Sequence, residues 1–164
     1  MNENEKTAEK IKASILELLK KKKLHFSHLV HSEATATKSS SAATGFDPSR
    51  GIKSLIIRGK KSSKNYLVCI LGHQRIDMKA LSLIVNEPCE FEKLEKIKEK
   101  YGLEIGGIPP FGSLLGIETY FDESISLCDK VIFAIGLSTE SVSMNPHELI
   151  ELIAPHIVQI ATMS

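Results

Sequence analysis

Apolar residues near the N-terminus recur at the spacing of a helix. They lie at i, i+4, i+7 and i+8, which places their side chains along one face, and most positions between them are polar. Residues 7–22 are therefore predicted to form an amphipathic helix with Thr7 as its N-cap, ending in a run of lysines that suits the negative end of the helix dipole. The apolar face consists of Ile11, Ile15, Leu18 and Leu19.

The middle of the chain carries short segments that are typical of strands. The clearest are residues 52–58 and 66–71, which are separated by the polar sequence GKKSSKN and are predicted to pair as a hairpin. Further short strands are predicted near residues 25–31, 89–91, 117–122, 130–135, 140–144 and 156–161.

Shorter helices are predicted around these strands. Asp77 can cap a helix that extends to Val85, and Pro146 suits the first turn of a helix over 146–153. Two more are predicted at 37–44, before Gly45 and Pro48, and at 92–101, before Gly102. Because helices flank the strands without strict alternation, residues 1–164 are predicted to form a single α+β domain with a mixed, largely antiparallel sheet.

The composition agrees with one globular domain. Of 164 residues, 42% are hydrophobic and 25% are charged, which argues against a disordered or fibrous chain. No apolar stretch is long enough to span a membrane, and the polar N-terminus lacks the apolar core of a signal peptide. Cys69, Cys89 and Cys128 lie far apart without metal-binding spacing, so we expect reduced thiols in a cytoplasmic protein with no membrane partner.

The charge is unevenly distributed along the chain. The protein has 21 basic and 20 acidic side chains, yet residues 50–64 contain six basic residues and no acidic one. Such a segment can face a phosphate group of a ligand. It can also be the solvated tip of the predicted hairpin, and the sequence leaves both interpretations open.

A second unusual segment is the glycine-rich sequence GGIPPFG at residues 106–112. Glycines let a backbone approach a ligand and aim successive N–H groups at one point, whereas prolines stiffen the turn without donating. The N–H groups of Gly106, Gly107 and Ile108 could therefore hold a phosphate or a developing oxyanion. A tight connection between a helix and a strand would explain the same composition.

Two charged residues also invite a functional interpretation. Lys53 opens the face of a predicted strand that continues with Leu55 and Ile57. It can project into a pocket and meet an anionic group, or keep its ammonium in water at the strand end. Asp122 follows another predicted strand and could either orient a ligand or cap a turn.

The sequence predicts no metal, cofactor or protein nucleophile. Strand parity places His25 and His31 on one face and His28 on the other, so the three cannot converge on a metal ion. No Ser/His/Asp order of a hydrolase is evident, and Cys69 lies within an apolar strand, where a thiol is inert.

Taken in order, several motifs resemble the YbaK/ProX family, an aminoacyl-tRNA deacylase domain that is also inserted in bacterial prolyl-tRNA synthetases. IKSLI at residues 52–56 is similar to the lysine-bearing strand of that family, and GGIPPFG is similar to its glycine-proline loop. The resemblance covers about residues 24–153. The other similar motifs are His31, AATG at 42–45, LGHQRID at 71–77, DES at 122–124 and AIG at 134–136.

The resemblance implies a curved mixed sheet that is partly closed like a barrel, and hydrolysis of the ester that joins a mischarged amino acid to the tRNA 3′ end. It implies that Lys53 engages the terminal adenosine or its phosphate, that the loop amides hold the aminoacyl carbonyl and its oxyanion, and that substrate hydroxyls position the water. The residues implied as catalytic are Lys53, Gly106 and Gly107. Those implied as substrate-binding are His31, Ile108, Pro110, Phe111, Gly112 and Asp122.

The expected function is therefore a free-standing aminoacyl-tRNA deacylase that acts in trans, with a tRNA(Pro)-type substrate. Its expected partners are the 3′ end of a mischarged tRNA and an aminoacyl-tRNA synthetase. One alternative is a non-catalytic module that binds aminoacyl-tRNA or a synthetase, and another is a small-molecule- or nucleotide-binding module. Residues 32–41 match the pocket-lining stretch of the family only loosely, which leaves the amino acid open.

Overall fold

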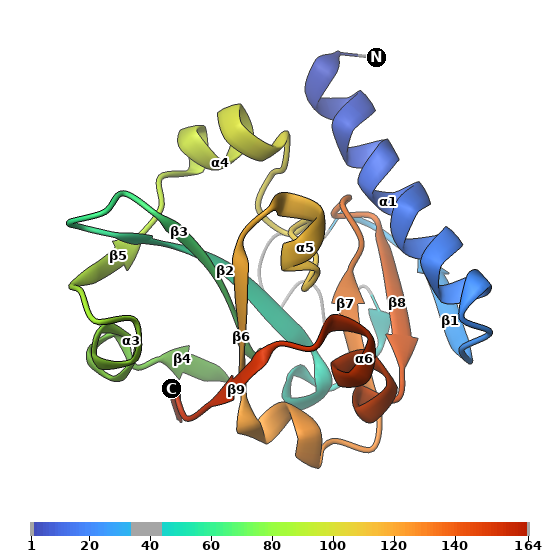
Figure 1. Ribbon diagram of the computed structural model, residues 1–164. Coiled ribbons are helices and arrows are strands. Elements are labelled where there is room, and N and C mark those ends of the chain that lie inside the picture. The colour runs from blue at the N-terminus through green and yellow to red at the C-terminus, as the bar shows by residue number, and fades with distance from the viewer. Residues whose placement is uncertain (1, 34–43, 164) are drawn as a thin grey trace.

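The computed structural model describes residues 2–33 and 44–163. Figure 1 shows a long N-terminal helix beside curved sheets that are surrounded by shorter helices. The α+β class with a mixed sheet is confirmed. The short helix predicted at 37–44 falls outside the described residues except at Thr44.

The N-terminal helix α1 spans Glu3–Lys21 and begins earlier than predicted. Its N-cap is Asn2, whose side chain accepts a hydrogen bond from the Glu5 N–H at 2.8 Å. The prediction of Thr7 as the cap was wrong, because Asn2 already supplies an acceptor and the polar turn that follows it is helical. Thr7 lies inside the helix and donates its hydroxyl to the Glu3 carbonyl. The residues that α1 buries are Ala8, Ile11, Ile15 and Leu19.

A five-stranded sheet forms the largest layer. Its strands are β2 (Ile52–Gly59), β3 (Asn65–Leu71), β5 (Cys89–Phe91), β6 (Glu118–Asp122) and β9 (His156–Val158). They lie in the order β5-β2-β3-β6-β9. The predicted hairpin of β2 and β3 is antiparallel, and β6 and β9 are added in parallel, so this sheet is mixed.

Two smaller antiparallel sheets complete the β-structure. One contains β1 (Phe26–Val30), β7 (Val131–Ala134) and β8 (Glu140–Met144), in the order β1-β8-β7, and the other pairs β4 (Gln74–Ile76) with β10 (Ala161–Met163). The prediction of one last strand over 156–161 was therefore wrong. Strand β9 pairs with β6, and just after it the Ile160 N–H donates to the Asp122 side chain. The chain then turns away from β6 and forms β10, which pairs with β4.

The two larger sheets approach each other without closing into a barrel. Gly51 and Ile132 form a parallel bridge between the start of β2 and strand β7. Strand β5 pairs with β2 only at Ile57–Gly59, so within the described chain no strand pairs with residues 52–56 on the side away from β3. The partly closed, curved sheet that the resemblance implied is present, with a gap along this edge.

Within residues 2–33 and 44–163, four short α-helices follow α1 around the sheets: α3 (Met78–Val85), α4 (Leu94–Tyr101), α5 (Gly112–Leu115) and α6 (Pro146–Ile153). As predicted, the Asp77 side chain caps α3, accepting from the Ala80 N–H at 3.0 Å, and Gly102 ends α4 with a left-handed φ of 67°. Helix α5 was not predicted, because four residues are too few to show a helical period. Short 3₁₀ helices occupy Pro48–Arg50 and Glu123–Leu127.

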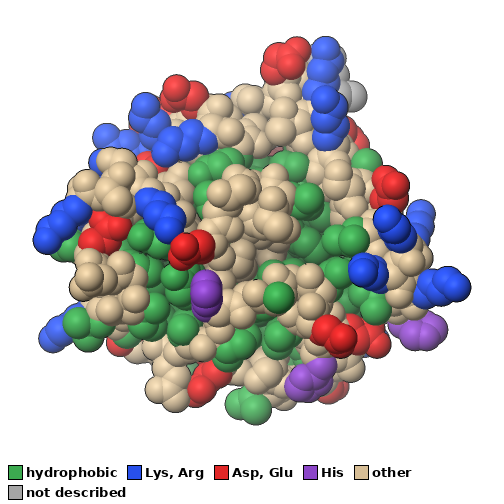
Figure 2. Space-filling model, in the orientation of Figure 1, with side chains coloured by type: hydrophobic (Ala, Val, Ile, Leu, Met, Phe, Trp, Pro, Cys, Tyr) green, Lys and Arg blue, Asp and Glu red, His purple; other side chains and the backbone are tan. Residues whose placement is uncertain are grey.

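Charged side chains of both signs are spread over the surface. Figure 2 shows Lys and Arg side chains along α1 and, on the opposite side of this view, over α4 and the β2–β3 hairpin, interleaved with acidic side chains. Among residues 2–33 and 44–163, no helix is both long and apolar enough to cross a membrane.

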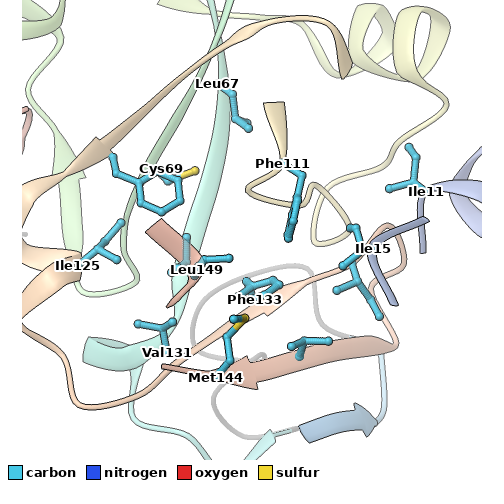
Figure 3. Packing of buried hydrophobic residues seen from close by; sticks show 14 of the residues in the cluster. Ile11, Ile15, Leu67, Cys69, Phe111, Ile125, Val131, Phe133, Met144 and Leu149 are labelled. Atoms are coloured by element: carbon cyan, nitrogen blue, oxygen red, sulfur yellow. The ribbon is translucent and has the colours of Figure 1, made fainter. Parts of the chain in front are cut away.

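The main core lies between the five-stranded sheet, the three-stranded sheet and α1. Figure 3 shows Phe111 pointing toward Phe133, and the two ring centroids are 5.9 Å apart. Both rings are almost fully buried, and burial of such a side chain contributes about 1.5–3 kcal/mol. A second apolar cluster around Ile57, Val68 and Ile70 covers the other face of β2 and β3. Strand β3 therefore has apolar neighbours on both faces.

Candidate functional site

A cavity of about 600 Å³ lies in the gap between β2 and β7. Residues 51–56 and 132–134 of these strands line it, together with the start of α4 and the loop that follows α4. The gap exists because β2 diverges from the three-stranded sheet beyond the Gly51–Ile132 bridge, before β5 joins the sheet. A cavity of this size suits a small molecule or the end of a larger one.

Lys53 reaches this cavity from the start of β2. The residue is half-buried, and its ammonium donates a hydrogen bond to the Gln74 carbonyl at 2.7 Å. Burial lowers the pKa of Lys53 from its ordinary value of 10.5. An ammonium has three N–H donors, and within the described chain the Gln74 carbonyl uses one, which leaves two for an anionic ligand.

The glycine-rich loop reaches the cavity through Gly106 and Ile108. Gly106 has a φ of 87°, a conformation that favours glycine. The N–H groups of Gly106 and Ile108 have no hydrogen-bond partner among the described residues. The Gly107 N–H, in contrast, donates to the Glu104 carbonyl at 3.0 Å. Of the three donors expected, two therefore lack a partner within the part of the chain that the structure describes.

The rest of this loop packs against the protein. Gly107 crosses Gly136 so closely that a Cβ atom on Gly107 would lie 2.8 Å from the Gly136 carbonyl oxygen. A Cβ atom on Gly112 would collide with the Thr119 side chain, so glycine is required there for packing. The loop residues that do not line the cavity are Gly107, Pro109, Pro110, Phe111 and Gly112.

His31 lines the cavity from the end of β1. Its Nδ1 lies 2.8 Å from the Ser32 carbonyl oxygen, and its Nε2 lies 2.9 Å from the Ser141 hydroxyl. Because a carbonyl only accepts, Nδ1 donates to it, and in the neutral ring Nε2 accepts from the Ser141 hydroxyl. Ser141 also lines the cavity, so these two side chains hold one of its walls.

Asp122 is buried and is not one of the cavity-lining residues. Its Oδ1 accepts hydrogen bonds from the Ile160 and Ala161 N–H groups, both at 2.9 Å, and its Oδ2 accepts from the Ser124 N–H at 3.0 Å. Asp122 thus caps the turn after β6 and anchors the C-terminal segment. This position corresponds to the turn-capping alternative that the sequence left open.

The basic residues of the segment 50–64 have different surroundings in the folded protein. Of its basic residues, only Lys53 lines the cavity. Arg58 and Lys64 form ion pairs with acidic residues of the neighbouring strands, at 2.9 and 2.8 Å, and Lys60 and Lys61 are exposed at the hairpin tip. Arg50 lies in the 3₁₀ helix before β2 and pairs with Asp129 at 3.5 Å. The hairpin-tip interpretation therefore describes the four basic residues from Arg58 to Lys64, and Lys53 is the one that lines the cavity.

Sequence reasoning missed part of the cavity wall. The missed polar residues include Ser54, Ser138 and Ser141, and the missed apolar ones include Phe91, Leu94 and Ile105. Isolated serines carry no motif, and the one usable signal was an aromatic residue at the end of a predicted strand. In the part of the chain that the structure describes, no group of three His, Cys, Asp or Glu side chains could hold a metal ion.

Residues 31–152 match the sequence profile of the aminoacyl-tRNA editing domain. This chain belongs to the aminoacyl-tRNA editing domain family. The resemblance to the YbaK/ProX family is thereby confirmed, and the cavity described above lies within the matched region, since its lining residues run from His31 to Ser141.

Other proteins resemble this editing domain in sequence or structure. The uncharacterized protein YwhH of Bacillus subtilis (strain 168) is 31% identical over 119 residues, which cover 72% of this chain and 75% of YwhH. The crystal structure of the hypothetical protein APE2540 matches with a TM-score of 0.81 at 21% identity and covers 90% of this chain and 99% of that one. A candidate trans-editing enzyme for prolyl-tRNA synthetase matches with a TM-score of 0.77 at 24% identity and covers 93% of this chain and 97% of that one. These structural likenesses show a shared fold.

Proposed function

We propose that this editing domain hydrolyses the ester bond of a mischarged aminoacyl-tRNA and acts in trans. The family match supports the substrate class. Lys53, Gly106 and Ile108 all line one cavity, and the N–H groups of Gly106 and Ile108 have no partner among the described residues. This combination suits an acyl ester joined to a phosphate backbone, because the ammonium can bind the terminal nucleotide while the amides receive the carbonyl oxygen.

In the proposed reaction, a water molecule adds to the carbonyl carbon of the ester. The negative oxygen of the tetrahedral intermediate accepts hydrogen bonds from Gly106 and Ile108, and each such donor can lower the barrier by about 3–4 kcal/mol. The bond from carbon to the ribose oxygen then breaks, and that oxygen takes up a proton in place of the one that the attacking water gives up, which yields free tRNA and a free amino acid. Hydroxyls of the substrate position the water, so no protein nucleophile takes part.

The other predicted residues have supporting places in this proposal. His31, held by Ser141, lines the same cavity and would contact the aminoacyl group there. Gly107, Pro110, Phe111 and Gly112 act on the substrate through the position of the loop, because they pack behind it. Asp122 does not line the cavity, and its place is structural, since it anchors the turn after β6.

We infer a tRNA(Pro)-type substrate. The inference draws on the resemblance of the motifs to the domain inserted in prolyl-tRNA synthetases, and on the shared fold with a candidate trans-editing enzyme for prolyl-tRNA synthetase. A non-catalytic module that binds aminoacyl-tRNA is the second candidate, because an ammonium and two amides can hold an ester end without turnover.

The test is a panel of alanyl-, cysteinyl-, prolyl-, seryl- and threonyl-tRNAs, including mischarged tRNA(Pro), incubated with wild type, Lys53→Ala and Lys60→Ala. We expect wild type to cleave at least one ester well above its spontaneous rate, and Lys53→Ala to lower kcat/KM by about 30- to 100-fold. Lys60→Ala removes the same charge at the exposed hairpin tip and should leave kcat/KM unchanged.

Each result of this panel decides a separate point. A wild type that binds aminoacyl-tRNA but cleaves no ester faster than water does would establish the non-catalytic module instead. If Lys53→Ala cleaves as well as wild type, Lys53 is not the phosphate-binding group. Cleavage that is fastest on a tRNA other than tRNA(Pro) would overturn only the inferred substrate.

A further inference from the structure

Three large apolar side chains surround the same cavity while remaining exposed to solvent. Phe91 is 56% exposed, Leu94 is 60% exposed and Ile105 is 50% exposed, and all three line the cavity. Single exposed apolar residues are normal on a soluble protein, but three that meet at one cavity form a surface suited to binding. They come from different segments: the end of β5, the first residue of α4 and the loop after α4.

The backbone that carries Phe91 and Leu94 is firmly held. Between them lies Glu92, which is buried and accepts hydrogen bonds from the Asn65 side chain at 2.8 Å and from the Lys100 ammonium at 3.2 Å. Burial by itself would raise the pKa of Glu92, but these hydrogen bonds outweigh it and the pKa is lowered. The backbone of Phe91 is also held by strand pairing, because β5 pairs with β2 and places Phe91 opposite Ile57.

The exposure of these side chains is therefore a property of an ordered surface. The ring of Phe91 and the side chain of Leu94, held in this way, provide a face on which a planar group can stack, and Ile105 lines the same cavity. Nucleobases of single-stranded RNA ends bind proteins by stacking on aromatic side chains of this kind.

Charge near this surface favours a nucleotide as its occupant. Lys53, with two spare N–H donors, lines the same cavity, and Lys93 is exposed between Phe91 and Leu94 in the sequence. Two acidic residues also line the cavity. The carboxylate of Glu92 is bound by Asn65 and Lys100, and that of Asp47 accepts a hydrogen bond from the Ser49 N–H at 2.8 Å. A ligand with a flat base and an adjacent phosphate would contact both kinds of group.

We propose that Phe91, flanked by Leu94 and Ile105, is the stacking platform for the terminal base of the tRNA 3′ end. This inference rests on the proposed function, in which that end enters the cavity, and it assigns a binding residue that the sequence motifs do not include. Stacking of the base would set the distance between the ester and the amides of Gly106 and Ile108.

The experiment measures binding of the trinucleotide CCA, which ends every tRNA, by isothermal titration calorimetry. The proteins are wild type, Phe91→Ala, Phe91→Trp and Leu127→Ala. Leu127→Ala is the matched control, because Leu127 is 84% exposed and does not line the cavity. A second ligand, CC ending in an abasic ribose, keeps the phosphates and lacks the stacking base.

We expect Phe91→Ala to raise the Kd for CCA by about 5- to 100-fold, and Phe91→Trp to keep or improve it. Leu127→Ala should bind like wild type, and the abasic ligand should bind wild type and Phe91→Ala equally. Thermal unfolding of each variant checks that the fold is intact.

Two results would overturn the platform. One is equal CCA affinity for wild type and Phe91→Ala. The other is an equal loss with the abasic ligand, which would show that Phe91 shapes the cavity without touching the base. If Phe91→Ala binds CCA normally but loses binding to an aminoacyl-tRNA synthetase, the surface docks a protein and the platform is likewise overturned.

These outcomes are separable from failure of the proposed hydrolysis. CCA has no ester, so its binding through Phe91 would stand even if no aminoacyl-tRNA is cleaved. Conversely, if Phe91→Ala cleaves aminoacyl-tRNA with an unchanged KM, the platform fails while the hydrolase proposal stands.

Discussion

Lys53 and Asp122 are both charged residues at an end of a buried strand, yet the fold uses them in opposite ways. Lys53 gives one of its three N–H donors to the Gln74 carbonyl and lies beside a cavity. Asp122 accepts from three backbone N–H groups, including those of Ile160 and Ala161, and lies away from that cavity. A charged group with unused hydrogen-bonding capacity next to a cavity can bind a ligand. A charged group whose hydrogen bonds are made to backbone N–H groups of its own chain, as in Asp122, anchors the fold instead.

The largest effect is expected when the anchor, Asp122, is removed, and this effect is on the free energy of unfolding. Asp122→Ala leaves the buried Ile160 N–H and its neighbour without an acceptor, and we expect it to lower the free energy of unfolding by about 3–4 kcal/mol. Ester hydrolysis per folded molecule should stay at the wild-type rate. Urea denaturation followed by circular dichroism gives the first quantity, and kcat/KM at low temperature gives the second.

Asp122→Asn is the matched control, because it keeps one acceptor oxygen and should lose less stability than Asp122→Ala. A variant at this position that stays as stable as wild type but no longer hydrolyses ester would place Asp122 in the site and remove the contrast with Lys53.

A pair of glycines sharpens the comparison between site and scaffold. Gly106 and Gly116 both have positive φ, at 87° and 71°, and only Gly106 lines the cavity. Alanine at either position should cost about 1–2 kcal/mol of stability because of backbone strain. Only Gly106→Ala should lower kcat/KM, by about tenfold, since it displaces an amide proposed to hold the oxyanion.

This pair offers a clean control, because nothing lies within 4 Å of a Cβ atom built on Gly116. Equal losses of kcat/KM in the two variants would mean that activity follows stability, and the loop would lose its proposed role.

The smallest expected effect concerns the pH dependence of Lys53. Burial lowers the pKa of Lys53, so its ammonium loses a proton at a lower pH than an ordinary lysine with a pKa of 10.5. Binding of the CCA phosphates needs the charged form, so affinity should fall as the pH rises toward this range and should fall a few-fold before 10.5 is reached.

Lys53→Arg provides the control for this titration, because a guanidinium keeps its charge throughout. The Kd for CCA, measured by calorimetry between about pH 7 and 10, should rise for wild type and stay level for the arginine variant. The same rise in both proteins would assign the titration to another group.

Much of the secondary structure could be predicted from local patterns. The hairpin of β2 and β3, the cap of α3 at Asp77 and the end of α4 at Gly102 were all predicted, because each depends on residues that are close in sequence. The errors have more than one cause. The final strand is split because Asp122 captures the Ile160 N–H, and α5 is too short to show a period.

The candidate site was also predictable only in part: its residues could be singled out from the sequence, but their assembly could not. Lys53, His31, Gly106 and Ile108 were singled out from sequence and do line one cavity. Their meeting depends on the divergence of β2 from β7, which no local pattern encodes. Phe91 was missed because an aromatic residue at the end of a predicted strand is a weak signal, and its exposure beside the cavity is visible only in the structure.

The sequence by itself determined the α+β class, the amphipathic α1 and the residue types that could hold an anionic ester. These properties depend on side-chain periodicity and on the backbone freedom of glycine and proline, which act over a few residues. Only the tertiary structure decided which loop amides are free. Gly107 donates to Glu104 and packs on Gly136, whereas Gly106 and Ile108 reach the cavity. The physical reason is that a hydrogen-bonding group is available to a ligand only when folding has left it without a partner, and the packing of this loop on Gly136 and beside the cavity is set by the tertiary structure.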